Sequence, residues 1–277
     1  MAVVAAAAGM FSCSDHADAP HEMSYVKGIT MMAEDFYYDS ASKVGVNVTP
    51  EKVEFAWEKG DKIGVFATTG NQVVFTLNKL GSDVRTALFD GGAWALKSPY
   101  KYSAYSPYIN DYGFERNEVP AVYGGQIQVG NANTDHIARF DYMAAKAESP
   151  EEGVVLFKFR HLGALIELEL PVSRLDENSN VSLSAASPVF VVKGTFDLSA
   201  ERVEVIPHAD GQSTSLNLTV KEIECDNEDV KLYMMVAPVD LSGQTLKVNL
   251  QVDGQKKNYS FAGRKLEAGK AYRVRAE

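Results

Sequence analysis

The sequence predicts an all-β protein, and three observations carry this prediction. Between residues 153 and 171 apolar and polar side chains alternate with a period of two, as in a strand with one buried face. A second alternating run, residues 245–252, leads into Asp253-Gly254, which is a favoured two-residue hairpin turn. Short runs of the same kind, separated by turns rich in glycine and aspartate, recur along the chain. This spacing is typical of a β-sandwich or barrel.

The length and charge of the chain limit its organisation and its partners. With 277 residues there is room for one large domain or for two ordinary ones, each with its own core, and we favour two. We expect domains at residues 44–150 and 151–277, because the polar stretch 147–153, interrupted by Pro150, is a suitable linker. The formal net charge of −10 argues against nucleic acid and anionic lipid surfaces as partners.

The N-terminus has the features of a lipoprotein signal. An apolar run, residues 2–11, is too short to span a bilayer but has the length of a signal-peptide core. It leads into Gly9-Met10-Phe11-Ser12-Cys13, which resembles a bacterial lipobox. We expect residues 1–13 to be a signal peptide and Cys13 to be lipidated, since several acyl chains anchor a protein stably. The alternative is an ordinary N-terminal tail with a chance cysteine. The basic region that normally precedes the apolar core of a signal peptide is absent, which is consistent with a start of the protein further upstream.

Residues 14–43 are expected to form a polar tail or pro-segment. Asp15 and Asp18 resemble the acidic signal that directs Bacteroidetes lipoproteins to the cell surface, so we expect a surface-exposed lipoprotein of the outer membrane. Residues 25–32 are an extended candidate. His16 and His21 are interpreted as solvated side chains and not as metal ligands.

The first domain is expected to be a series of short strands. The alternating runs are residues 44–48, 53–57, 63–67, 73–77 and 86–89. Residues 94–108 are rich in aromatic side chains, for which two roles are open. Such side chains can bind the faces of sugars, but they more commonly fill the core. Residues 109–133 are expected to be a loop, and residues 136–147 are ambiguous between a short helix and a strand.

In the second domain the phase of the alternation changes near His161. Before His161 the apolar residues Val155, Phe157 and Phe159 have odd numbers, whereas from Leu162 onward the alternating apolar residues have even numbers. A shift of one residue turns every following side chain to the other face of the sheet. We therefore expect a bulge at residues 161–163, or a passage of the chain from one sheet to another. The chain should end in a strand at residues 272–276.

No pattern in the sequence indicates catalysis or a bound cofactor. The histidines lie far apart and lack zinc-ligand spacing, and no nucleophile elbow, phosphate loop or dinucleotide fingerprint occurs. Cys225 stands between Glu224 and Asp226, whose charges raise a thiol pKa, so we interpret it as structural or incidental. The expectation is a non-enzymatic protein with no metal and no cofactor.

Three segments together resemble the fimbrillin family, the pilus subunits and anchors of Bacteroidales. Residues 55–66 (FAWEKGDKIGVF) look like the family's W-x-x-G-D-x-I-G-V stretch, and residues 102–108 (YSAYSPY) look like its Tyr/Phe-x-A-Y-x-P segment. Residues 141–145 (DYMAA), leading to 156–162 (LFKFRHL), look like its D-x-M-A and F-x-H run. The resemblance implies two transthyretin-like β-sandwich domains in tandem, a lipidated precursor, no catalysis, and assembly with other pilin subunits by donor-strand addition.

Two departures from the family pattern bear on the role of the chain in a pilus. Stalk subunits of the family are cut after an arginine near the N-terminus, but here the first arginine is Arg85. Lys43 stands about where that arginine would fall, so maturation, if it occurs, is expected after Lys43. The chain also ends at Glu277, directly after its last expected strand. These features favour a tip, accessory or non-polymerising lipoprotein over a stalk subunit, and a glycan-binding surface lipoprotein is the alternative.

Overall fold

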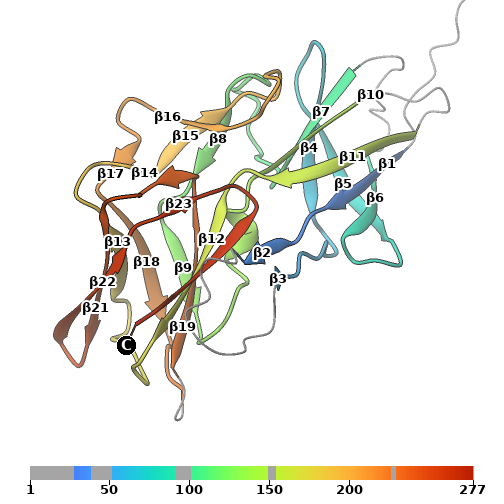
Figure 1. Ribbon diagram of the computed structural model, residues 1–277. Helices are drawn as coiled ribbons and strands as arrows, with labels where there is room; N and C mark the ends of the chain where they lie inside the picture. The colour runs from blue at the N-terminus through green and yellow to red at the C-terminus, as the bar shows by residue number, and fades with distance from the viewer. Residues whose placement is uncertain (1–27, 39–51, 92–100, 149–153, 226–228, 277) are drawn as a thin grey trace, which may run out of the picture.

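The computed structural model describes residues 28–38, 52–91, 101–148, 154–225 and 229–276. Within these ranges the chain forms β-sheets and a short 3₁₀ helix, η2 (Ile137–Arg139), which confirms the all-β prediction. Figure 1 shows a barrel at one end of the molecule and packed sheets at the other. In the described ranges no helix has both the length and the apolar character needed to cross a membrane.

The barrel is closed by strands in the order β1-β11-β10-β7-β4-β5-β6 (Figure 1). Its core contains Trp57, Phe75, Phe89, Phe157 and Phe159, each at most 2% exposed. On β11 every second side chain points inward, as the period of a strand requires. The barrel strands are β1 (Gly28–Ala33), β4 (Lys62–Ala67), β5 (Val73–Leu80), β6 (Thr86–Asp90), β7 (Lys101–Ser106), β10 (Met143–Glu148) and β11 (Val154–His161).

Two five-stranded sheets at the other end share a second hydrophobic core. Leu168, Leu183 and Val248 contribute to this core from different strands and are completely buried. The first sheet has the order β19-β12-β24-β2-β3, with strands β2 (Phe36–Tyr38), β3 (Lys52–Val53), β12 (Ala164–Leu170), β19 (Val230–Val236) and β24 (Lys270–Arg275). The second has the order β22-β21-β13-β18-β9, with strands β9 (Gln126–Val129), β13 (Asn180–Ser184), β18 (Ser215–Lys221), β21 (Thr245–Val252) and β22 (Gln255–Ala262).

Three smaller sheets complete the described part of the fold. In one of them β8 pairs with β15, a strand that lies far along the chain. The strands are β8 (Val119–Val122), β14 (Phe190–Val191), β15 (Lys193–Phe196), β16 (Val205–Pro207), β17 (Gln212–Ser213), β20 (Val239–Asp240) and β23 (Lys265–Leu266). Since β8 and β9 fall within residues 109–133, the expected loop is wrong there.

The predicted break near His161 is confirmed. β11 ends at His161 and β12 begins at Ala164, with Leu162 and Gly163 between them. β11 belongs to the barrel, whereas β12 lies in a five-stranded sheet, so the chain passes from one sheet to another at this point. The change of parity in the sequence therefore marks the place where the inward direction changes.

The division into domains at residue 150 stays a prediction, and strand pairings cross it in both directions. β11 follows residue 150 and pairs with β1 and β10, which precede it. β8 and β9 precede residue 150 and pair with β15 and β18, which follow it. The two halves of the sequence are consequently interlocked.

The predicted hairpin is confirmed as β21 and β22. Leu246, Val248 and Leu250 are buried on one face, and the register runs without interruption from Thr245–Ala262 to Val252–Gln255. Asp253 and Gly254 both have positive φ, 53° and 72°, as the favoured turn requires. The expected final strand is also present, as β24.

Side chains cap the free edge of β19. Gln126 Nε2 donates to the carbonyl of Met235 at 2.7 Å, and Met235 N donates to Gln126 Oε1 at 2.8 Å. Gln128 repeats the arrangement two residues on, with the carbonyl of Lys231 at 3.0 Å and the amide of Tyr233 at 2.8 Å. Both glutamines are completely buried. Their amide groups take the place of a neighbouring strand and satisfy backbone groups that an open edge exposes.

Candidate functional site

Strand β1 closes the barrel and is the first described strand of the chain. It pairs in parallel with β11, from Gly28–Val154 to Ala33–Phe159, and antiparallel with β6 on its other side (Figure 1). Without β1, the facing edges of β6 and β11 would carry unpaired backbone groups along an open groove. The expected extended segment, residues 25–32, therefore overlaps the strand that completes this barrel.

The chain continues from β1 into β2, which belongs to a different sheet. β2 pairs in parallel with β24 and antiparallel with β3. Residues 28–38, which we call the bridging segment, thus supply one strand to the barrel and one to the neighbouring sheet. Any event that removes this segment alters both sheets.

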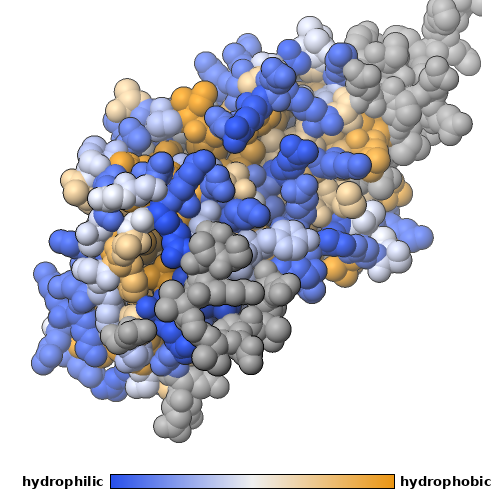
Figure 2. Space-filling model, in the orientation of Figure 1, coloured by the Kyte–Doolittle hydropathy of each residue, from blue (hydrophilic) through white to orange (hydrophobic). Residues whose placement is uncertain are grey.

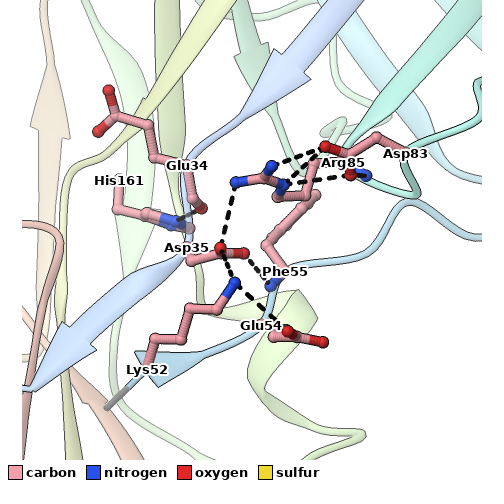
Figure 3. Close-up of polar contacts among 8 residues, drawn as sticks. All are labelled: Glu34, Asp35, Lys52, Glu54, Phe55, Asp83, Arg85 and His161. Atoms are coloured by element: carbon pink, nitrogen blue, oxygen red, sulfur yellow. Dashed lines mark hydrogen bonds and ion pairs between the residues drawn. The ribbon is translucent and has the colours of Figure 1, made fainter.

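Asp35 lies between the two strands and carries a buried carboxylate. Its side chain is 0% exposed and accepts a hydrogen bond from Lys52 Nζ at 2.8 Å and from the Phe55 amide at 3.0 Å. Arg85 Nη1 lies 3.2 Å from the same carboxylate. Figure 3 shows Asp35 pointing between the two cationic side chains. Burial alone would raise the pKa of Asp35, but these hydrogen bonds and charges outweigh it, so the pKa lies below its ordinary value.

His161 binds the backbone next to Asp35. Its Nε2 lies 2.5 Å from the Glu34 carbonyl oxygen and its Nδ1 lies 2.8 Å from Asp141 Oδ1, while Phe36 stacks on the ring at 3.8 Å between centroids. Both ring nitrogens face acceptors, so the protonated imidazolium makes both hydrogen bonds. Burial opposes that charge, yet Asp141 and the Glu34 carbonyl prevail and raise the pKa of His161. His161 is thus a buried polar residue with a partner at each ring nitrogen, and it stands at the predicted strand break.

Tyr38 fixes the other end of the bridging segment. Its hydroxyl donates to Glu167 on β12, a residue only 2% exposed, and the Arg273 guanidinium lies over its ring at 4.4 Å. Arg273 also binds Glu167, with an Nη2 to Oε2 distance of 3.0 Å. Burial and the carboxylate of Glu167 raise the pKa of Tyr38, so the hydroxyl stays a donor.

A pocket of about 460 Å³ lies beside these residues. Phe36 and Asp141 line it together with Trp57 and Tyr108, so it borders the contacts of the bridging segment. Of the aromatic stretch that suggested sugar binding, Tyr108 lines this pocket, whereas Tyr102 and Tyr105 are at most 1% exposed and serve the cores. Within the described ranges, no group of three or more His, Cys, Asp or Glu side chains is placed to hold a metal ion.

The residues expected to be modified lie outside the described ranges. These are Cys13, the expected lipidation site, and Lys43, the expected processing site, and both stay predictions. The sequence did not reveal the roles of Asp35, Arg85 and Glu167. Of these three residues, only Asp35 stands in a local pattern that could have indicated a buried acidic side chain, because it lies between the apolar run 31–33 and the aromatic run 36–38.

Comparisons with known proteins agree on one fold. A family model described as fimbrillin-like matches residues 47–277. A candidate cell adhesion protein from Bacteroides ovatus ATCC 8483 has 16% identity and a TM-score of 0.60, with 91% of each chain covered. A candidate cell adhesion protein from Bacteroides uniformis ATCC 8492 also has 16% identity, with a TM-score of 0.54 and coverage of 80% of this chain and 88% of that one.

A third candidate cell adhesion protein, from Bacteroides fragilis NCTC 9343, again has 16% identity, with a TM-score of 0.52 and coverage of 91% of this chain and 92% of that one. None of the curated proteins compared with the chain matches it. At such identities the structural likeness establishes a shared fold.

Proposed function

The chain belongs to the fimbrillin-like family, and from this premise we propose that it is a surface lipoprotein with a structural or adhesive role. In this proposal it is a subunit of a pilus that assembles by donor-strand addition. The location is the outer surface of the cell, with the lipid on Cys13 as the anchor. Membership of this family and the absence of a catalytic pattern in the sequence support a non-enzymatic role.

The observation that carries the proposal is the position of β1. It is a terminal segment of the described chain, and yet it lies inside the barrel order, between β6 and β11. In donor-strand addition a partner's extended segment replaces such a strand, so that backbone hydrogen bonds provide affinity and alternate side chains provide specificity. Removing β1 opens the barrel between β6 and β11 and leaves the pairings among its other strands intact.

Locking β1 in place tests this proposal. Met32 of β1 and Lys158 of β11 are exposed register partners, so Met32→Cys combined with Lys158→Cys should form a disulfide across the pair. We expect the oxidised variant to be missing from polymers sheared from the cell surface, and reduction before assembly to restore it. The measurement is the ladder of polymers on a denaturing gel.

The matched control places a disulfide where no strand is expected to leave. Lys247 and Ser260 are exposed register partners in the β21–β22 hairpin, and Lys247→Cys with Ser260→Cys should leave assembly unchanged. Normal incorporation of the oxidised Met32–Lys158 variant contradicts displacement of β1.

A further inference from the structure

The bridging segment is held by four side chains that belong to the rest of the protein. Lys52 and Arg85 bind the Asp35 carboxylate, His161 binds the Glu34 carbonyl, and Glu167 accepts from the Tyr38 hydroxyl. We call Lys52, Arg85, His161 and Glu167 the socket. The socket spans both sheets, because His161 ends β11 of the barrel and Glu167 lies on β12 of the neighbouring sheet.

Lys52 and Arg85 each have a second partner outside the bridging segment. Arg85 Nη2 lies 2.6 Å from Asp83 Oδ2, and Lys52 Nζ lies 3.3 Å from Glu54 Oε1 (Figure 3). The bond with Arg85 lowers the pKa of Asp83 to about 2, so Asp83 stays ionised at neutral pH. Both second partners are substantially exposed, at 43% and 74% of their side chains, whereas Asp35 is fully enclosed.

The other two members are supported in the same way. His161 Nδ1 is held by Asp141 at 2.8 Å, and Glu167 is held by Arg273 at 3.0 Å. Asp141 and Arg273 lie outside residues 28–38. All four socket side chains therefore keep an oriented partner when the bridging segment leaves, and a site supported in this way stays preorganised for the next occupant.

We infer that the socket selects the strand that replaces the bridging segment. The occupant is an extended segment of a partner subunit that carries a carboxylate at the position of Asp35 and a phenol three residues later, at the position of Tyr38. The carboxylate fills the enclosed site between Lys52 and Arg85, and the phenol donates to Glu167 and stacks under Arg273. This inference rests on the proposed strand addition and names the chemistry of the partner.

The chain itself provides the probe and two matched controls. A recognition sequence for a site-specific protease is placed after Lys43 in the full chain. The cut protein is unfolded in urea, freed of the N-terminal fragment and refolded with fluorescent peptides of residues 28–38. The Asp35→Asn peptide lacks the carboxylate that Lys52 and Arg85 bind, and the Tyr38→Phe peptide lacks the hydroxyl that donates to Glu167. The Glu34→Gln and Tyr37→Phe peptides make the same chemical changes at neighbouring side chains that are exposed.

The expected result is a selective loss of affinity. The Asp35→Asn peptide should bind about tenfold or more weakly, because it forfeits charge-assisted hydrogen bonds in an enclosed site. The Tyr38→Phe peptide should lose about two- to fivefold, and both control peptides should stay within about twofold of the original. Arg85→Gln in the protein should reduce the difference in affinity between the original peptide and the Asp35→Asn peptide, as a double-mutant cycle measures.

The outcomes separate the two ideas. Equal binding by the original, Asp35→Asn and Tyr38→Phe peptides overturns the socket and leaves strand addition standing. Failure of the original peptide to bind overturns strand addition at this site and the socket with it. A preference for the original peptide over the Asp35→Asn peptide that Arg85→Gln does not reduce assigns the effect to the peptide alone and contradicts the inference.

Discussion

At the scale of single residues, Asp35 and His161 make the retention of the bridging segment depend on pH in opposite directions. The pKa of Asp35 is lowered from 3.8, so its stabilising effect is present above that value and is lost as pH falls through the lowered pKa. The pKa of His161 is raised from 6.5, so its effect is complete below that value and is lost as pH rises through the raised pKa. These two residues should therefore stabilise the folded protein most between about pH 3.8 and pH 6.5.

The pH prediction concerns the alkaline limit of this range. His161→Gln should lower the free energy of unfolding by about 1–3 kcal/mol below pH 6.5, because buried groups lose a hydrogen-bond partner. The difference from the unmodified protein should shrink as pH rises above 6.5. Urea unfolding of both proteins across the pH range measures it.

The control for this experiment is His208→Gln, which changes an exposed histidine. At every pH, the free energy of unfolding of this variant should be nearly the same as that of the unmodified protein. A difference for His161→Gln that does not vary with pH would show that His161 contributes only by packing.

At the scale of the strand, the two glutamines of β9 that cap the edge of β19 should contribute to stability and prevent self-association. Gln126→Leu keeps a similar volume but leaves the amide and carbonyl of Met235 without their partners. An unsatisfied buried backbone group costs about 1–3 kcal/mol, so the free energy of unfolding should fall by about that amount. The exposed edge should also promote pairing between copies, which light scattering would detect as oligomers.

The matched control is Gln255→Leu, since Gln255 is exposed on β22. That variant should remain monomeric with unchanged stability. If Gln126→Leu behaves in the same way, water satisfies the edge and the glutamine cap is unnecessary.

Strands were predictable where neighbours in the sequence determine their burial. β11, β12 and β21 each bury a continuous face, and the alternation of apolar residues in 153–171 and 245–252 predicts that face. β8 and β9 were not predictable, because each has only four residues and its partner lies in the other half of the chain. Pro120 lies in β8, an edge strand, where proline is tolerated but weakens the local signal.

The site was less predictable than the strands for a related reason. The partners of Asp35 are Lys52 and Arg85, which lie 17 and 50 residues away, and their convergence follows from the closure of the barrel. His161 stands 127 residues from the carbonyl it binds. The sequence located the histidine at a strand irregularity, but only the fold shows which segment it holds.

At the scale of the whole molecule, the proposal distinguishes two mature forms. A subunit that retains the bridging segment should begin at a lipidated Cys13 and remain monomeric or lie at a pilus end. A subunit within the stalk should begin at Val44, after cleavage at Lys43. N-terminal mass mapping of monomers and sheared polymers measures both.

The Cys13→Ala variant is the control for the anchor, because it has no thiol to lipidate. It should move from the membrane fraction to the soluble fraction, and continued association with membranes contradicts the anchor. A polymer whose subunits all begin at Cys13 contradicts processing at Lys43.

The surface of the molecule is mixed in character. Figure 2 shows hydrophilic side chains over most of the visible face, with an apolar patch at the barrel end where β1 and β11 lie in Figure 1. Met32 and Leu156, on these two strands, are 38% and 51% exposed. Both β1 and its neighbour β11 thus carry an exposed apolar side chain.

The bridging segment also determines how the molecule would bear a mechanical load. If the chain is tethered at Cys13, tension between the anchor and the folded body passes through residues 28–38. A pull along these strands acts across the hydrogen bonds that join β1 to β11 and β2 to β24. The bonds of each ladder are then sheared together and do not open one at a time. The segment that a partner strand would displace is thus also the first described part of the chain to carry tension from an anchor at Cys13.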